Sequence, residues 1–154
     1  MEVSTSALNS IVSVLKSGAQ FYAEAAKQTN DPGTAEVFEE LAQTRFAAIE
    51  EIDEAIRGFN ETPAAADWVD QARAMYASIK AMTGDTEATL VDSLYRHEQH
   101  TLASLKHALD DVVDRDIRSM LLRHYETFFS THAKMEKLSQ LASHTRAPDK
   151  LTSY

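Results

Sequence analysis

Four stretches of the chain repeat apolar residues every three or four positions, and this repeat restricts the fold more than any other feature. Such spacing is that of one face of an α-helix. The first stretch runs from Leu8 to Ala26, and the turn residues Asn30 to Gly33 end it. The second predicts a helix from about Thr34 to Arg57. The third runs from Leu90 to Val112 and the fourth from Ile117 to Leu138. The sequence therefore predicts an all-α fold with four long helices.

The length and the residue content agree with a single helical domain. The chain has 154 residues, 44% of them hydrophobic, which is enough for one ordinary core. It has only four Gly and three Pro, few for a sheet with many turns. We expect residues 1–142 to form the bundle. Residues 143–154 contain Pro148 and no apolar repeat, so they are expected to form a frayed C-terminal tail.

The links between the stretches predict how the helices connect. Short turns join the first helix to the second and the third to the fourth, so each pair should be an antiparallel hairpin. The link between the pairs has about 25 residues, and its own apolar repeat from Trp68 to Met82 predicts a short extra helix. A long crossover between helices two and three is typical of ferritin-like four-helix bundles. From this connection we expect the first and third helices to run parallel.

Charge and composition exclude several classes of function. The formal net charge is −9, and the Lys and Arg residues are scattered, so nucleic acid is not an expected partner. No apolar run has the roughly 18 residues that a membrane span needs, and no membrane partner is expected. Residues Met1 to Asn9 lack the order of a secretory signal. The chain has no Cys, which excludes disulfides and thiolate sites, and a cytoplasmic location is expected.

Two charged residues interrupt the apolar repeats near their centres. Arg45 lies in the second stretch and Glu98 in the third, at mid-height of the predicted bundle. We expect the two to pair across the core through charge-assisted hydrogen bonds. The alternative is that the stem of Arg45 packs on the core while its head reaches water, which would leave Glu98 near the edge. Tyr22, Tyr125 and His132 complete the predicted interior polar site.

With these residues the chain resembles the ferritin-like superfamily, in particular a bacterial branch of unknown function that carries an Arg in this part of helix two. The resemblance covers Leu8 to Leu138 and implies a bundle that can hold two iron ions. The complete metal site has one Glu from each of two helices and Glu-x-x-His from each of the others. In helix one, the family's Glu and the Tyr seven residues later fall on Leu15 and Tyr22. In helix three, the family's Glu falls on Glu98, with Leu105 seven residues further on.

The remaining ligand positions depart from the family pattern. Helix two has Arg45 and Ala48 where ligands would stand. Helix four can be aligned in two registers, which place either Phe128 and Thr131 or Phe129 and His132 on the family's Glu-x-x-His. At most two of the six ligands therefore remain, Glu98 and His132. A guanidinium stays protonated in proteins and cannot become a ligand. The resemblance thus implies a degenerate di-iron site without a resident cofactor.

Other candidate sites carry weaker signals. His97, His100 and His107 lie on related faces of the third helix, but two turns separate His100 from His107, too far for one ion. A phosphotransfer role would need an exposed His among small residues, and His107 beside Ala108 is a poor version of it. Acidic runs such as Glu50 to Glu54 are expected to be solvated. The sequence has no zinc-protease motif, phosphate-binding loop or recognisable nucleophile.

The sequence thus predicts a cytoplasmic, ferritin-like bundle that is not an enzyme and that acts as a binding or structural module. The alternative is a metal-binding protein that holds iron or another divalent metal with Glu98 and His132. A homo-oligomer is compatible with either hypothesis, and the sequence names no protein partner.

Overall fold

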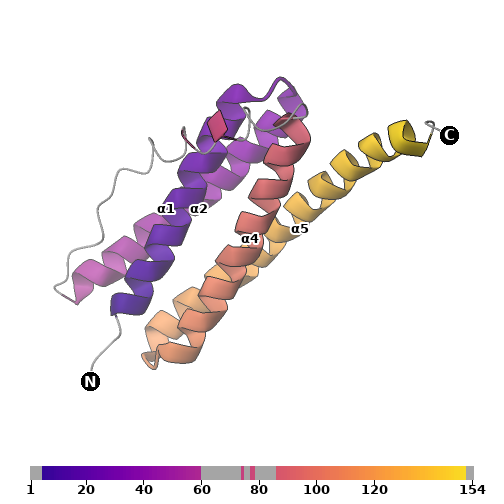
Figure 1. Cartoon of the computed structure of the whole chain (residues 1–154). Helices are drawn as coiled ribbons and strands as arrows, with labels where there is room; N and C mark the ends of the chain where they lie inside the picture. Colours follow the sequence, from indigo (N-terminus) through magenta and orange to yellow (C-terminus); the bar gives the residue numbers. More distant parts are fainter. Residues whose placement is uncertain (1–4, 60–73, 75–76, 79–85, 152–154) are drawn as a thin grey trace.

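The computed structural model describes residues 5–59, 74, 77–78 and 86–151. The four long helices expected from the sequence are present (Figure 1), and the described residues contain no strand. These helices are α1 (Thr5–Gln28), α2 (Pro32–Gly58), α4 (Thr86–Asp111) and α5 (Arg115–Leu151). The predicted all-α fold is confirmed. Within the described residues, no helix is both long and apolar enough to cross a membrane.

The helix ends follow local sequence signals. Asp31 caps α2 by accepting a hydrogen bond from the backbone of Thr34 at 3.2 Å, and Pro32 occupies the first turn, where its missing N–H costs nothing. Asp114 caps α5 by accepting from the backbone N–H of Ile117 at 3.0 Å. Arg118 donates to the carbonyl of Leu109, which occupies an acceptor that the end of α4 leaves open. Both hairpin turns are thus closed by their own side chains.

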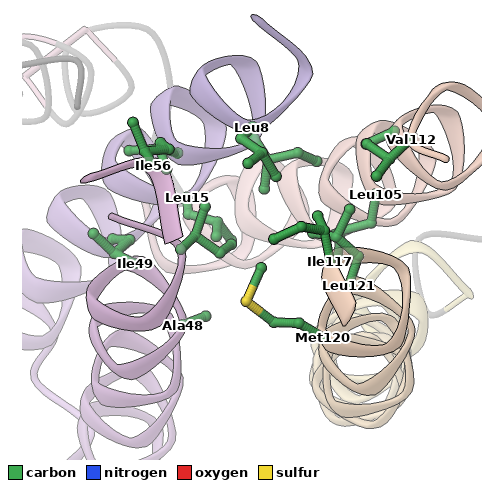
Figure 2. Close-up of a cluster of buried hydrophobic side chains, with 14 of the residues drawn as sticks. Leu8, Leu15, Ala48, Ile49, Ile56, Leu105, Val112, Ile117, Met120 and Leu121 are labelled. Carbon is green, nitrogen blue, oxygen red and sulfur yellow. The ribbon is translucent and has the colours of Figure 1, made fainter. Parts of the chain in front are cut away.

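Two clusters of buried apolar side chains show the direction of each helix. One cluster joins the beginning of α1 and the end of α2 to the end of α4 and the beginning of α5, and Figure 2 shows Leu8, Ile56, Val112 and Ile117 from it. The other joins the opposite helix ends, with Ala25, Phe38, Leu90 and Met135 among its members. Helix α1 is therefore antiparallel to α2 and to α4. Helices α2 and α4 run in the same direction.

The expectation that the first and third helices run parallel is therefore wrong. A link that carries the chain from the end of α2 back to the other end of the bundle makes the second and third helices parallel, and the first and third antiparallel. Most of this link, including most of the predicted helix from Trp68 to Met82, lies outside the described residues.

The helices pack closely within each hairpin, and α1 also packs against α4. Helices α2 and α5 approach each other less closely. Helix α5 continues past the end of the bundle (Figure 1) and reaches Leu151, whereas the sequence predicted a frayed tail from residue 143. The last core residues of α5 are the buried Met135 and the half-buried Leu138. The end of an apolar repeat marks where packing stops, not where the internal backbone hydrogen bonds of a helix must stop.

Candidate functional site

Arg45 lies in the interior of the bundle with none of its side chain exposed. Its position in the apolar repeat of α2 points the guanidinium inward, toward α4. Nη2 donates to Oε2 of Glu98 at 3.0 Å and to the hydroxyl of Thr101 at 2.8 Å. Glu98 is also fully buried, and the two charges form an ion pair. The contact expected between Arg45 and Glu98 is present, and neither residue reaches water.

Glu98 receives a second hydrogen bond from α1. The hydroxyl of Tyr22 donates to Oε1 of Glu98 at 2.9 Å, so both carboxylate oxygens are engaged. Burial, followed by the charge of Glu98, raises the pKa of Tyr22 well above its usual value, and the phenol therefore stays a donor. The Thr101 hydroxyl in turn donates to the carbonyl of His97 at 2.9 Å. Donors and acceptors alternate through this cluster, as a buried polar network requires.

The rest of the Arg45 guanidinium is held by contacts other than hydrogen bonds. Nε and Nη1 have no hydrogen-bond partner among the described residues. The carbon between the three nitrogens lies 5.4 Å from the ring centre of Tyr22 and 5.4 Å from that of Phe128, within the range of cation–π attraction. Gly18 of α1 provides the space, because a Cβ at this position would lie 2.5 Å from Nη1. Side chains or backbone from all four described helices thus surround one cation.

His97 adjoins this network without adding charge. Burial, followed by the positive charge of Arg45, lowers the pKa of His97 to about 4. Its Nδ1 has no hydrogen-bond partner within the described part of the chain. At neutral pH the imidazole is therefore uncharged, and Arg45 is the cation that neutralises Glu98.

Three of the five predicted interior residues come together, and two do not. Tyr22, Arg45 and Glu98 form the network, whereas Tyr125 and His132 are half-buried on α5. The ring of His132 lies 5.2 Å from the ring of Tyr95, on the side of the bundle where α4 and α5 meet.

The buried residues of α5 at this level are Phe128 and Thr131, while Phe129 is 59% exposed. Of the two possible registers, the one with Phe128 and Thr131 inward is the one observed. The expectation that Tyr125 and His132 lie in the interior is therefore wrong. The face of α5 that packs against the core is centred on Phe128 and Thr131, so Tyr125 and His132 lie at its edge.

Sequence reasoning missed two residues of the network. Gly18 stands in the middle of α1, where glycine lowers helix stability by roughly 1 kcal/mol relative to alanine. A glycine kept at such a position signals a close approach of another group, which here is Arg45. Thr101 stands three residues after Glu98, so both lie on one face of α4. Its spacing from Glu98 could have identified it as a partner.

The interior offers few groups that could hold a metal ion. Leu15 and Ala48, where the resemblance would place metal ligands, are buried and apolar. In the described part of the chain, no group of three or more His, Asp or Glu side chains is arranged to hold an ion. This arrangement supports a closed ion pair. Oε2 of Glu98 and the hydroxyl of Thr101 both accept from the guanidinium of Arg45, and Oε1 of Glu98 accepts from the phenol of Tyr22.

The other histidines considered from the sequence lie on the surface. His100 and His107 line a groove of about 510 Å³ between α1 and α4. Nε2 of His107 lies 3.8 Å from a carboxylate oxygen of Asp111, and both side chains are mostly exposed. Neither histidine contributes to the interior network.

Comparison with protein families gives one match. Residues 3–111 match the family described as a domain of unknown function, DUF2383. The match therefore covers α1, α2 and α4 and ends at the last residue of α4. No curated protein matches the chain.

Proposed function

The chain belongs to the DUF2383 family, and we propose that it is a ferritin-like bundle that acts as a non-catalytic binding or structural module. The observation that carries this proposal is the buried pair of Arg45 and Glu98, which fills the centre of the bundle with a fixed cation. A ferritin-like protein with a working di-iron centre has carboxylates and histidines there.

The topology supports the ferritin-like part of the proposal. Helices α2 and α4 run in the same direction, so the 27 residues between Gly58 and Thr86 must carry the chain from one end of the bundle to the other. One long crossover between two antiparallel hairpins is the connection that distinguishes ferritin-like bundles from simple up-and-down bundles.

The polar contacts support the non-catalytic part. Glu98 uses one oxygen for Tyr22 and the other for Arg45, so a metal ion would have to displace a donor to reach it. The guanidinium would also repel a dication at close range. His132, the second ligand of the metal-binding alternative, lies beside Tyr95 at the margin. Because the network is fully buried, a substrate has no direct access to its charged groups.

Metal analysis of the purified protein tests the proposal. Protein prepared without a histidine tag, and dialysed against iron, manganese or zinc, should retain far less than one ion per chain. Glu98→Ala should leave the small residual amount unchanged, as should the control Glu39→Ala, which removes an exposed carboxylate. About one or two tightly bound ions per chain, lost in Glu98→Ala and kept in Glu39→Ala, would refute the proposal in favour of the metal-binding alternative.

A further inference from the structure

Of the described helices that pack on one another, α2 and α5 have the loosest contact, which we call the α2–α5 joint. The helices pack closely within each hairpin, and α1 packs on α4. Across the α2–α5 joint, Glu51 of α2 lies against Arg123 and His124 of α5, and Glu40 pairs with Lys134. Close packing of helices therefore holds three sides of the bundle, whereas the fourth depends more on polar side chains.

His124 is the buried member of this group of side chains. It is 9% exposed, and its Nε2 lies 2.6 Å from Oε1 of Glu51. Nη1 of Arg123 donates to the same oxygen at 3.2 Å. The guanidinium stays protonated in proteins, so it already neutralises the charge of Glu51. A positive charge on His124 would be buried and would have to share this carboxylate with Arg123.

The surroundings of His124 oppose its protonation. Burial lowers the pKa of the imidazole, and the charge of Arg123 on the same helix acts in the same direction. The charge of Glu51, from α2, raises the pKa without reversing this shift. Helix α4 contributes apolar side chains to the core at this end of the bundle, Leu102 and Leu105 among them. His124 is therefore uncharged at neutral pH while α2 and α5 are in contact.

A state in which α5 has moved away from α2 would remove this opposition. The imidazole of His124 would then be hydrated, and its pKa would return toward the ordinary value of 6.5. A proton thus binds more tightly to the open state than to the closed state, so acid favours the open state by linkage. Each pH unit below 6.5 can change the ratio of the two states by up to about tenfold.

We propose that the α2–α5 joint is an acid-sensitive opening of the bundle, with His124 as the group whose protonation favours the open state. Phe128 follows His124 by one helical turn, and its ring centre lies 5.4 Å from the guanidinium carbon of Arg45. Movement of α5 at this level therefore removes one wall of the interior network and gives Arg45 access to solvent, while α1 and α4 stay packed. This inference does not rest on the proposed function, which concerns metal content and catalysis.

The reactivity of a single buried thiol tests this opening, because the chain itself has no Cys. Figure 2 shows Ala48 of α2 and Met120 of α5 pointing toward each other, and Ala48 is 2% exposed. Ala48→Cys therefore places the thiol in the α2–α5 joint. The matched control, Ala108→Cys, places it where α4 packs on α1, at a residue that is 3% exposed. The rate of reaction with a small aromatic disulfide is divided by the rate for the same variant unfolded at the same pH, which removes the effect of thiol ionisation.

From pH 7 to pH 5, the normalised reactivity of Ala48→Cys should rise by roughly 3- to 25-fold, and that of Ala108→Cys should rise much less. Adding His124→Gln should abolish the rise at Ala48→Cys. Adding His97→Gln should leave it in place, because His97 lies on α4 and outside the joint. Circular dichroism of each variant checks that its helical content is unchanged.

A nuclear magnetic resonance titration of His124 gives a second measurement that needs no cysteine. Its pKa should lie below 6.5 in the parent, and lower still in Glu51→Gln, which removes the charge that raises it. The proposal is overturned if the two thiols gain the same reactivity, since acid would then loosen the whole bundle. It is also overturned if the rise survives His124→Gln, or if the pKa of His124 is 6.5 or higher, because protonation would then favour the closed state.

Discussion

Ion pairs join the α1–α2 hairpin to the α4–α5 hairpin both inside the bundle and along its surface. Inside, Arg45 of α2 pairs with Glu98 of α4, and both side chains are fully buried. On the surface, Glu40 and Glu51 of α2 pair with Lys134 and Arg123 of α5, and these side chains are about half exposed. The same helix therefore places one charge inward and two outward to contact the opposite hairpin.

The interior and surface pairs differ in how strongly solvent screens their charges. The surface pairs lie between α2 and α5, which approach each other less closely than the helices within each hairpin, so long side chains span a gap that water and salt can enter. The interior pair has no such screening, and each partner is isolated in a medium of low polarity if the other is removed. We therefore expect the interior pair to fix the position of α2 relative to α4, and the surface pairs to tolerate change.

The largest effect should come from breaking the interior pair. Arg45→Met and Glu98→Leu should each lower the free energy of unfolding by about 3 to 5 kcal/mol, because the remaining charge is left buried without its partner. The double variant should recover most of this loss, since apolar residues of similar volume can replace a buried ion pair. Urea denaturation followed by circular dichroism measures all three. Losses that simply add in the double variant would show that the pair is not an energetic unit.

Gly18→Ala should have the next largest effect on the free energy of unfolding. In an exposed helix this change stabilises by about 1 kcal/mol. Here the new Cβ would lie 2.5 Å from Nη1 of Arg45, so the guanidinium must shift and its bonds to Glu98 and Thr101 must lengthen. We expect a net loss of about 1 to 3 kcal/mol, the usual range for overpacking.

Gly58→Ala is the matched control, because nothing lies within 4 Å of a Cβ at that position. Its free energy of unfolding should equal or exceed that of the parent. If Gly18→Ala were as stable as this control, the close contact between Gly18 and Arg45 would not restrict the interior.

The two regions also differ in how well the sequence predicts them. Arg45 and Glu98 could be predicted to pair because each interrupts an apolar repeat near its centre, where a lone charge is costly. The inward face of α5 could not be predicted in this way. Tyr125 and His132 fit the apolar repeat of α5 as well as the buried His124 and Thr131 do. Only packing against the other helices decides between these faces.

The directions of the helices depend on how the long link runs, which the apolar repeats do not record. The same repeats placed the four long helices correctly, since each turn carries its own capping or turn residues, such as Asp31 and Asp114. Local signals therefore predicted the elements, and contacts between distant residues determined their relative direction and the contribution of Gly18.

The acid stability of the protein tests the environment of His97. The pKa of this histidine is about 4 in the folded protein and about 6.5 when unfolded, so between these values the unfolded chain binds more protons. Its contribution is therefore fully present above pH 6.5 and is lost as the pH falls toward 4. From pH 7 to pH 5 we expect it to remove roughly 1 kcal/mol, after allowance for partial solvent exposure.

The variant His97→Gln should show a shallower loss of unfolding free energy than the parent over this range, and nuclear magnetic resonance should place the imidazole titration well below that of an unfolded peptide. Because the charge of Arg45 is the second cause of the lowered pKa, Arg45→Met should raise the pKa of His97. An unchanged pKa in that variant would show that burial alone accounts for it.

The smallest effect should come from the surface pairs, and it completes the comparison with the interior. Glu40→Gln and Lys134→Met remove the two partners of a pair whose side chains are 54% and 46% exposed. Water solvates whichever charge remains, so each single change should cost less than about 1 kcal/mol, and the coupling energy from the double-variant cycle should be a few tenths of a kcal/mol. This coupling should fall further in high salt, whereas the coupling between Arg45 and Glu98 should not, because salt does not reach a buried pair. A coupling between Glu40 and Lys134 as large as the interior one would mean that solvent exposure does not set the strength of these contacts.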